Sequence, residues 1–215
     1  MSFDYLPGTN IYLKQRKDMF RVNTDTHLLG KFMIIKENDK VLDIGTNNGA
    51  LLLYASQYTK NLYGVDILEE AIALAKENLA YNDVCAHLEN VAVQEYYPGL
   101  VFDRIITNPP YFNTGNDGNK NANRFLEVAR HDKYLPLDDL FSAFNRLLSE
   151  NGHIYMVHRP SYLGFIMLMC DKYGFKIVRL KMVYDENKNE AVSLLLELKR
   201  GKIDLIKVER DIIVR

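Results

Sequence analysis

Short apolar runs alternate along the chain with longer stretches in which apolar residues recur every three or four positions. The short runs predict buried strands at 40–45, 62–67, 86–93, 102–108, 153–158, 175–185 and 191–200. The helical spacing predicts helices at 49–58, 69–82, 137–150 and 163–173. This alternation is typical of a parallel sheet with helical crossovers. The sequence therefore predicts an α/β fold with a mostly parallel, seven-stranded sheet.

The two ends of the chain depart from this repeat. Only five residues, 186–190, separate the last two predicted strands, so these form an antiparallel hairpin. Residues 1–38 precede the first strand and are expected to be an appended segment, with the main domain at 39–215. The polar residues Asn23, Thr24, Asp25 and Thr26 leave two alternatives open there: a helix start with Thr24 or Asp25 as N-cap, or direct contacts to a ligand. The Asn- and Gly-rich stretch 113–123 is expected to be a mobile loop.

Composition excludes several classes of protein. The chain has 215 residues, 47% of them hydrophobic, which is enough for a substantial core. Its 27 basic and 28 acidic residues give no field that would favour wrapping a polyanion. Cys85 and Cys170 lie far apart without metal-ligand spacing, so neither a disulfide framework nor a metal site is expected. No apolar run is long enough for a membrane span, and we expect a cytoplasmic protein.

A first group of candidate ligand-binding residues surrounds the turn after the first predicted strand. The sequence DIGTNNG, residues 43–49, carries Gly45 and Gly49, and Asp66 ends the second strand. A glycine-containing strand-to-helix turn lets a ligand approach the backbone, and an acid about 20 residues later can hold ribose hydroxyls. The spacing is not GxGxxG, and the Asp43 carboxylate would repel a pyrophosphate. The cationic nucleoside S-adenosylmethionine fits these features.

The most specific motif is Asn108-Pro109-Pro110-Tyr111, which directly follows the fourth predicted strand. The Asn108 carboxamide and the Pro109 carbonyl offer two acceptors held rigidly by proline, and Tyr111 offers a flat face. Together they would receive a planar amine. Accepting both amine hydrogens would localise the nitrogen lone pair without requiring a charged base.

With VLDIGTNNG, GVDI and NPPY, the chain resembles class I S-adenosylmethionine-dependent methyltransferases of the amino-methylating group. The resemblance implies a Rossmann-like fold with helices on both faces of the sheet. It also implies that the catalytic group is 108–111 and that the cofactor is held by Asp43, Gly45, Asn47, Gly49, Asp66, Ile67, Asn90, Val91 and Asn108. Asn47 replaces a common glycine, and Asn tolerates the positive φ that the turn needs.

The segments FRVNTDTHLLGKF (20–32), NPPYF (108–112), VARHD (128–132) and GHIYMVHRP (152–160) resemble a narrower group. This group comprises the bacterial enzymes that methylate N6 of the adenine beside the anticodon of valine tRNA. The resemblance implies a tRNA partner, and it places residues 1–38 on the cofactor site with Thr26 as a contact. RNA contacts are expected from Phe112, Arg130, His131 and Arg159. Further basic residues that could touch RNA are Lys172, Lys176, Arg179, Lys181, Lys199, Arg200 and Lys202.

Other substrates remain open at this point, because several related enzymes share the NPPY motif. They methylate the guanine N2 of ribosomal RNA, adenine in DNA, or a glutamine of release factors. The chain shows no separate target-recognition domain for DNA and no large helical domain before Lys40 for a release factor. Two other classes of function are a non-catalytic RNA-binding module and a nicotinamide-dependent oxidoreductase. The absence of GxGxxG disfavours the oxidoreductase.

Overall fold

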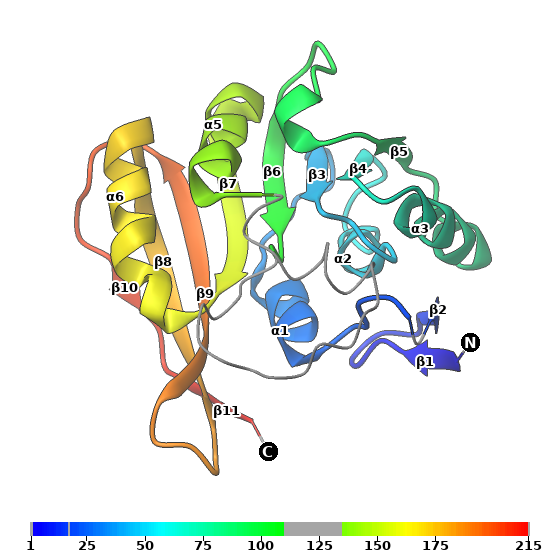
Figure 1. Ribbon diagram of the computed structural model, residues 1–215, viewed down its shortest axis with the longest axis horizontal. Helices are drawn as coiled ribbons and strands as arrows, with labels where there is room; N and C mark the ends of the chain where they lie inside the picture. Colours follow the sequence, from blue (N-terminus) through cyan, green and yellow to red (C-terminus); the bar gives the residue numbers. More distant parts are fainter. Residues whose placement is uncertain (1, 17, 110–134, 215) are drawn as a thin grey trace.

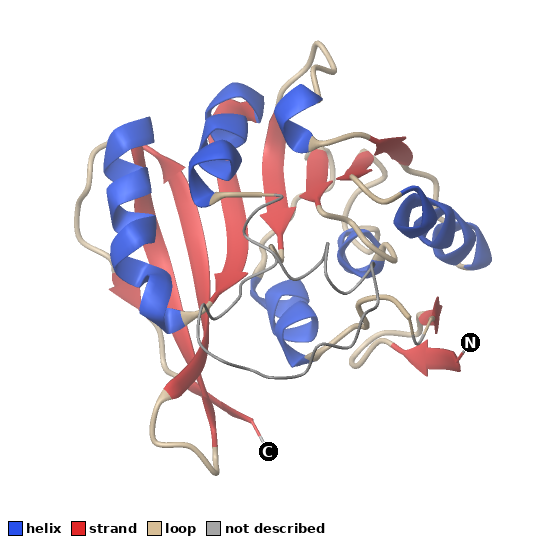
Figure 2. Ribbon diagram, in the orientation of Figure 1, coloured by secondary structure: helices blue, strands red, loops and turns tan. Residues whose placement is uncertain are grey.

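Nine strands form one sheet in the part of the chain that the computed structural model describes, residues 2–16, 18–109 and 135–214 (Figures 1 and 2). They are β3 (Val41–Ile44), β4 (Leu62–Asp66), β5 (His87–Asn90), β6 (Phe102–Thr107), β7 (Leu148–His158), β8 (Phe175–Asp185), β9 (Ala191–Arg200), β10 (Lys207–Val208) and β11 (Ile212–Val214). The order across the sheet is β10-β8-β9-β7-β6-β3-β4-β5, and β11 also pairs with β8.

The mostly parallel sheet with a final antiparallel hairpin is confirmed. Strands β5, β4, β3, β6 and β7 run parallel, while β9 is antiparallel to both β7 and β8. The seven predicted strands are all present. The two additional strands, β10 and β11, are short and run parallel to β8 along its outer edge. They were not predicted, because two or three residues carry too little periodicity to identify a strand.

Helices cover both faces of the sheet (Figure 1). They are α1 (Thr24–Phe32), α2 (Ala50–Ala55), α3 (Glu69–Tyr81), α5 (Leu137–Leu147) and α6 (Leu163–Tyr173), with single turns η1 (Val93–Glu95) and η2 (Pro160–Tyr162). Successive strand residues point to opposite faces, so Leu42 packs with α5 and Val41 packs with α2. Because both faces are covered, the central strands carry apolar residues on both faces, which is why they were readily predicted.

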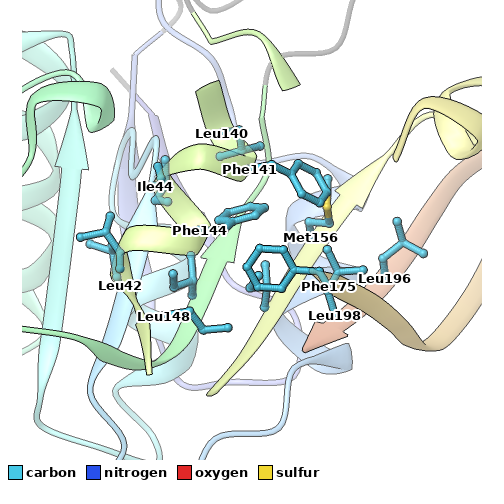
Figure 3. Close-up of a cluster of buried hydrophobic side chains, with 14 of the residues drawn as sticks. Leu42, Ile44, Leu140, Phe141, Phe144, Leu148, Met156, Phe175, Leu196 and Leu198 are labelled. Atoms are coloured by element: carbon cyan, nitrogen blue, oxygen red, sulfur yellow. The ribbon is translucent and has the colours of Figure 1, made fainter. Parts of the chain in front are cut away.

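The core under α5 and α6 is rich in aromatic side chains (Figure 3). Phe141 and Phe144 of α5 meet Phe175 of β8, with edge-on ring contacts at centroid distances of 6.1 and 6.5 Å. All three rings are fully buried. Edge-on packing of this kind adds stabilisation beyond the burial of apolar area, and it fixes α5 against the sheet.

Several predicted boundaries were wrong. Helix α5 ends at Leu147, not at residue 150, and β7 begins at Leu148 rather than at 153. Leu148 is 2% exposed and is paired with Phe102 of β6, so sheet pairing outcompetes helix continuation there. The N-cap of α1 is Asn23, whose side chain accepts the Thr26 N–H at 3.0 Å, and not Thr24 or Asp25.

Residues before β3 form a hairpin and the helix α1. Strands β1 (Ser2–Tyr5) and β2 (Tyr12–Gln15) pair antiparallel, and this hairpin was not predicted. Leu6 and Leu13 are fully buried and join the cluster that contains Leu29 and the apolar side chains of α2. The hairpin and α1 therefore share one core with the sheet.

Helices α1 and α2 touch at Gly30, and this contact yields a stability prediction. A Cβ at Gly30 would lie 2.5 Å from Cδ2 of the buried Tyr54 ring. We expect Gly30→Ala to lower the free energy of unfolding by about 1–3 kcal/mol, despite the better helix propensity of alanine. Urea denaturation measures this change in the free energy of unfolding. Gly164→Ala is the matched control, because a Cβ there meets nothing within 4 Å. Equal unfolding midpoints for Gly30→Ala and wild type would contradict the tight packing.

Candidate active site

The candidate site lies where the strand order reverses. Strand β3 is flanked by β4 on one side and β6 on the other. In open α/β sheets, ligands bind outside the carboxyl ends of the strands at such a reversal. The turn after β3 and the segment Asn108-Pro109 after β6 meet there, and α1 lies across the same end of the sheet (Figure 1).

The turn between β3 and α2 is a series of left-handed residues. Gly45, Asn47 and Gly49 have φ values of +74°, +49° and +79°. A Cβ at Gly45 would meet nothing within 4 Å, so the space beside this backbone is open. Asn47 adopts the positive φ expected of it, and its side-chain amide donates to the Phe20 carbonyl at 3.1 Å. An asparagine here thus gives the turn an anchor to the segment before α1, which glycine could not.

Asp66 at the end of β4 organises the neighbouring loops. Its Oδ2 accepts the Asn47 N–H at 2.8 Å, and its Oδ1 accepts the Leu68 N–H at 3.0 Å. Burial raises the pKa of Asp66, and these backbone hydrogen bonds oppose that shift. The Asp66 carbonyl accepts the Asn90 side-chain amide at 2.9 Å and the Val91 N–H at 3.0 Å. Each carboxylate oxygen keeps acceptor capacity for a ligand hydroxyl.

Asp43 is a buried carboxyl group that has no hydrogen-bond partner in the described part of the chain. It is 1% exposed, and both of its carboxyl oxygens are unpaired. Burial raises the pKa of Asp43 to about 7, and the Asp66 charge adds to this shift. The nearby Thr46 hydroxyl opposes the shift without reaching normal hydrogen-bond geometry. Thr46 Oγ1 and Asn48 Nδ2 are also buried and unpaired. Such orphaned groups fit a site that is completed by a polar, cationic ligand.

Asn108 is half-buried and contacts α1. Its Nδ2 donates to the Thr26 hydroxyl at 3.2 Å, and that hydroxyl in turn lies 3.1 Å from Asn23 Oδ1. Pro109, which follows, is buried. One cavity, with about 330 Å³ of empty space, is lined by Phe20, Val22, Thr26, Gly45, Thr46, Asn47, Asn48, Ala50, Leu51 and Asn108. The structure thus brings the predicted turn, Thr26 and Asn108 together.

Other predicted site residues lie outside the described part of the chain or do not line the cavity. Pro110, Tyr111, Phe112, Arg130, His131 and the loop 113–123 lie outside the described residues. Ile67 is 48% exposed beside Asp66. Arg159 is exposed and donates to the Val192 carbonyl at 2.9 Å. Its neighbour His158 is buried, which lowers the pKa of that imidazole to about 4.

Arg179, predicted as a possible RNA contact, has an internal role instead. Its Nε lies 2.6 Å from Glu197 Oε2, and its Nη2 donates to the Phe32 carbonyl at 2.6 Å. Its guanidinium also stacks 3.9 Å from the centroid of the Phe32 ring. Because Phe32 ends α1, this cation stabilises the carboxyl end of the helix that carries Thr26.

Sequence reasoning missed Asn78, which holds the turn between β3 and α2 in place. This fully buried side chain accepts the Lys14 N–H at 2.7 Å and donates to the Asn48 carbonyl at 2.9 Å. A signal was available, because Asn78 lies four residues after Leu74 on the apolar face of α3. A polar residue on a buried stripe needs a partner, and here its partners are the turn and β2.

Within the described residues, no three His, Cys, Asp or Glu side chains gather as a metal site would require. The helices described there include none that is long and apolar enough to cross a bilayer.

Several known proteins are similar to this chain in sequence. The Methyltransferase small domain family matches residues 14–175. The tRNA1(Val) (adenine(37)-N6)-methyltransferase of Aliivibrio salmonicida is 30% identical over 181 residues, covering 82% of this chain and 76% of that protein. Its Vibrio campbellii counterpart is 32% identical over 187 residues, covering 85% and 77%.

Among solved structures, the T. thermophilus 16S rRNA N2 methyltransferase, in complex with AdoMet and guanosine, has a similar fold. Its TM-score is 0.64 at 18% identity, and the match covers 94% of this chain and 50% of that one. The fold, the site at the strand reversal and the match over residues 14–175 agree, and this chain belongs to the Methyltransferase small domain family.

Proposed function

We propose that this methyltransferase transfers the methyl group of S-adenosylmethionine to the exocyclic N6 of adenine 37 in tRNA(Val). Relatives of that name match most of this chain, and the matches cover about three quarters of their own length. The observation that carries the proposal is the position of Asn108, whose carboxamide lines the same cavity as the glycine turn. An amine acceptor and a nucleoside-binding turn in one cavity are what amine methylation requires.

The residues around the turn fit the cofactor. Gly45 leaves room for close approach, and the Asp66 carboxylate would accept the ribose hydroxyls. The unpaired Asp43 carboxyl would face the cationic methionine end, and Ile67, Asn90 and Val91 would surround the adenine ring. Asn47 and Gly49 hold the turn in shape. When bound, S-adenosylmethionine supplies an electrophilic methyl group on a positively charged sulfur.

Asn108 and Pro109 would orient the target amine. The Asn108 Oδ1 and the Pro109 carbonyl accept its two hydrogens and draw the lone pair out of conjugation with the ring. The proton that the amine loses would pass to water after transfer. Alignment of the reacting centres is the main catalytic effect and can supply on the order of 7–11 kcal/mol.

An anticodon loop suits such a site, because its bases can splay outward at little unpairing cost. The segment 1–38 would pack on the cofactor site through Thr26 and through the Phe20 carbonyl held by Asn47. Arg159, exposed after β7, would reach the RNA backbone. A tRNA substrate would place the enzyme in the cytoplasm.

Incubation with total tRNA and methyl-labelled S-adenosylmethionine, followed by nucleoside analysis, tests the proposal. Label in N6-methyladenosine of tRNA(Val) is expected. Label only in N2-methylguanosine would overturn the adenine assignment. Calorimetry with S-adenosylmethionine and NAD separately tests the cofactor, and preferential binding of NAD would refute it.

A further inference from the structure

We infer that Thr26 is a positioning residue that sets the orientation of the Asn108 carboxamide, rather than a contact to the methyl donor. The inference rests on the proposed function, in which Asn108 Oδ1 receives the amine. It assigns to α1 a role in catalysis in addition to the roles of the turn at residues 43–49 and of the NPPY motif.

The direction of each hydrogen bond fixes the next one. Asn23 Oδ1 accepts the Thr26 backbone N–H at 3.0 Å, so the atom facing Thr26 is an oxygen and not the amide nitrogen. The Thr26 hydroxyl lies 3.1 Å from the same oxygen, which has no hydrogen to give, so in this contact the hydroxyl is the donor. With its hydrogen engaged there, the hydroxyl acts as an acceptor toward Asn108, whose Nδ2 donates to it at 3.2 Å.

This chain of bonds decides which end of Asn108 is free. An asparagine side chain can rotate by 180° and exchange its donor and acceptor ends. In the rotated state, Asn108 Oδ1 would face the Thr26 hydroxyl, which could donate to it only by giving up its hydrogen bond to Asn23. The observed state leaves Oδ1 with no donor among the described residues, so it is available for an amine. Thr26 thereby favours the orientation that presents Oδ1, rather than NH₂, to the substrate.

The start of α1 is held firmly enough for this task. Thr26 is 6% exposed. The chain entering the helix is fixed by the Val22 N–H, which donates to Gln15 Oε1 at 2.7 Å, and by the bond from Asn47 to the Phe20 carbonyl. Asn23 and Thr26 are therefore preorganised, and binding need not order them.

The test compares Thr26→Val, Thr26→Ser and Thr59→Val, measuring kcat on tRNA, S-adenosylmethionine affinity and thermal unfolding. Valine keeps the shape of threonine but cannot accept the Asn108 N–H. We expect Thr26→Val to lower kcat by roughly 10- to 100-fold, less than the loss of a group that contacts the reacting centre, because Thr26 acts only through Asn108. Cofactor affinity should stay within about twofold, and Thr26→Ser should restore kcat to within about threefold.

Thr59→Val is the matched control. Thr59 is also a buried threonine, and its hydroxyl donates to the Asp39 carbonyl at 2.9 Å, just before the amino end of β3. It should lose stability but keep wild-type kcat. Should Thr26→Val not fold, Thr26→Ala removes the same hydroxyl without adding a methyl group. Unchanged kcat in either variant, or a loss confined to cofactor affinity, would overturn the inference.

A double-mutant cycle separates positioning from general damage. If Thr26 acts through Asn108, then Thr26→Val should have almost no effect on kcat in an Asn108→Ala background. Full additivity of the two losses would refute the inference while leaving the proposed function intact. If wild-type enzyme labels no N6-methyladenosine in tRNA, it is the proposed function that fails, and this outcome is seen before any variant is made.

Discussion

Asn108→Ala is expected to lower kcat by about 100- to 1000-fold, the usual cost of removing a preorganised hydrogen-bonding group from a reacting centre. The alanine variant cannot accept the amine hydrogen, so the lone pair stays delocalised and the base is no longer aligned. The fold should tolerate the change, because the Asn108 side chain is half-buried and its one hydrogen bond within the described residues is to Thr26.

Single-turnover methylation of tRNA measures the effect, and calorimetry should show S-adenosylmethionine affinity within about threefold of wild type, since the turn and Asp66 are untouched. Asn61→Ala is the control. Its side chain bonds the Asn38 carbonyl at 3.3 Å near the amino ends of β3 and β4. A normal kcat in Asn108→Ala would show that this carboxamide does not contact the reacting amine.

Asp43→Asn should raise the stability of the fold and weaken the binding of the cofactor. In wild type without cofactor, burial raises the Asp43 pKa from 3.8 to about 7, so folding favours the neutral acid. Well below pH 3.8 both the folded and unfolded states are protonated, and the group carries no penalty. As the pH rises towards 7 the unfolded state gains by ionising, and the fold loses stability on the order of a few kcal/mol. The carboxamide of the variant cannot ionise, so its stability advantage over wild type should widen between pH 5 and pH 8.

The same substitution should weaken binding of S-adenosylmethionine by about 10- to 100-fold at pH 8, because a charge-assisted contact is lost. Wild-type affinity should fall as the pH drops below 7 and Asp43 takes up a proton, whereas Asp43→Asn should show no such dependence. Urea unfolding and calorimetry at both pH values measure the two effects. Asp83→Asn removes an exposed carboxylate as a control. A pH-independent wild-type affinity would mean that Asp43 does not face the cation.

The sequence was most informative for strands that are buried on both faces of the sheet. Strands such as β3 are apolar apart from Asp43, and their order along the chain made the sheet predictable. Asn47 also behaved as its side chain allows, with a φ of +49°. The end of α5 was not predictable, because the helix ends where Leu148 pairs with Phe102, a residue 46 positions earlier in the chain.

Polar contacts at long range were harder to predict than strands. The turn, Asp66 and the motif at 108 could be identified from their spacing along the chain. Asn78 could not be assigned a role, since its carboxamide bonds the backbone of Lys14, which only folding brings near. Asn23 acts locally, as the N-cap of α1, where Thr24 and Asp25 are equally suitable residue types. The orientation of Asn108 depends on Thr26, 82 residues away, and periodicity carries no record of such a contact.

Strands β10 and β11 protect one edge of the sheet from pairing with other protein chains. Without them, the eleven-residue β8 would offer a long row of free amides and carbonyls to any other extended chain. The two short strands occupy parts of that row, and Lys181, Lys207 and Glu209 place charges along it. Such covering discourages edge-to-edge aggregation, and the opposite edge is the four-residue β5, too short to recruit a neighbour.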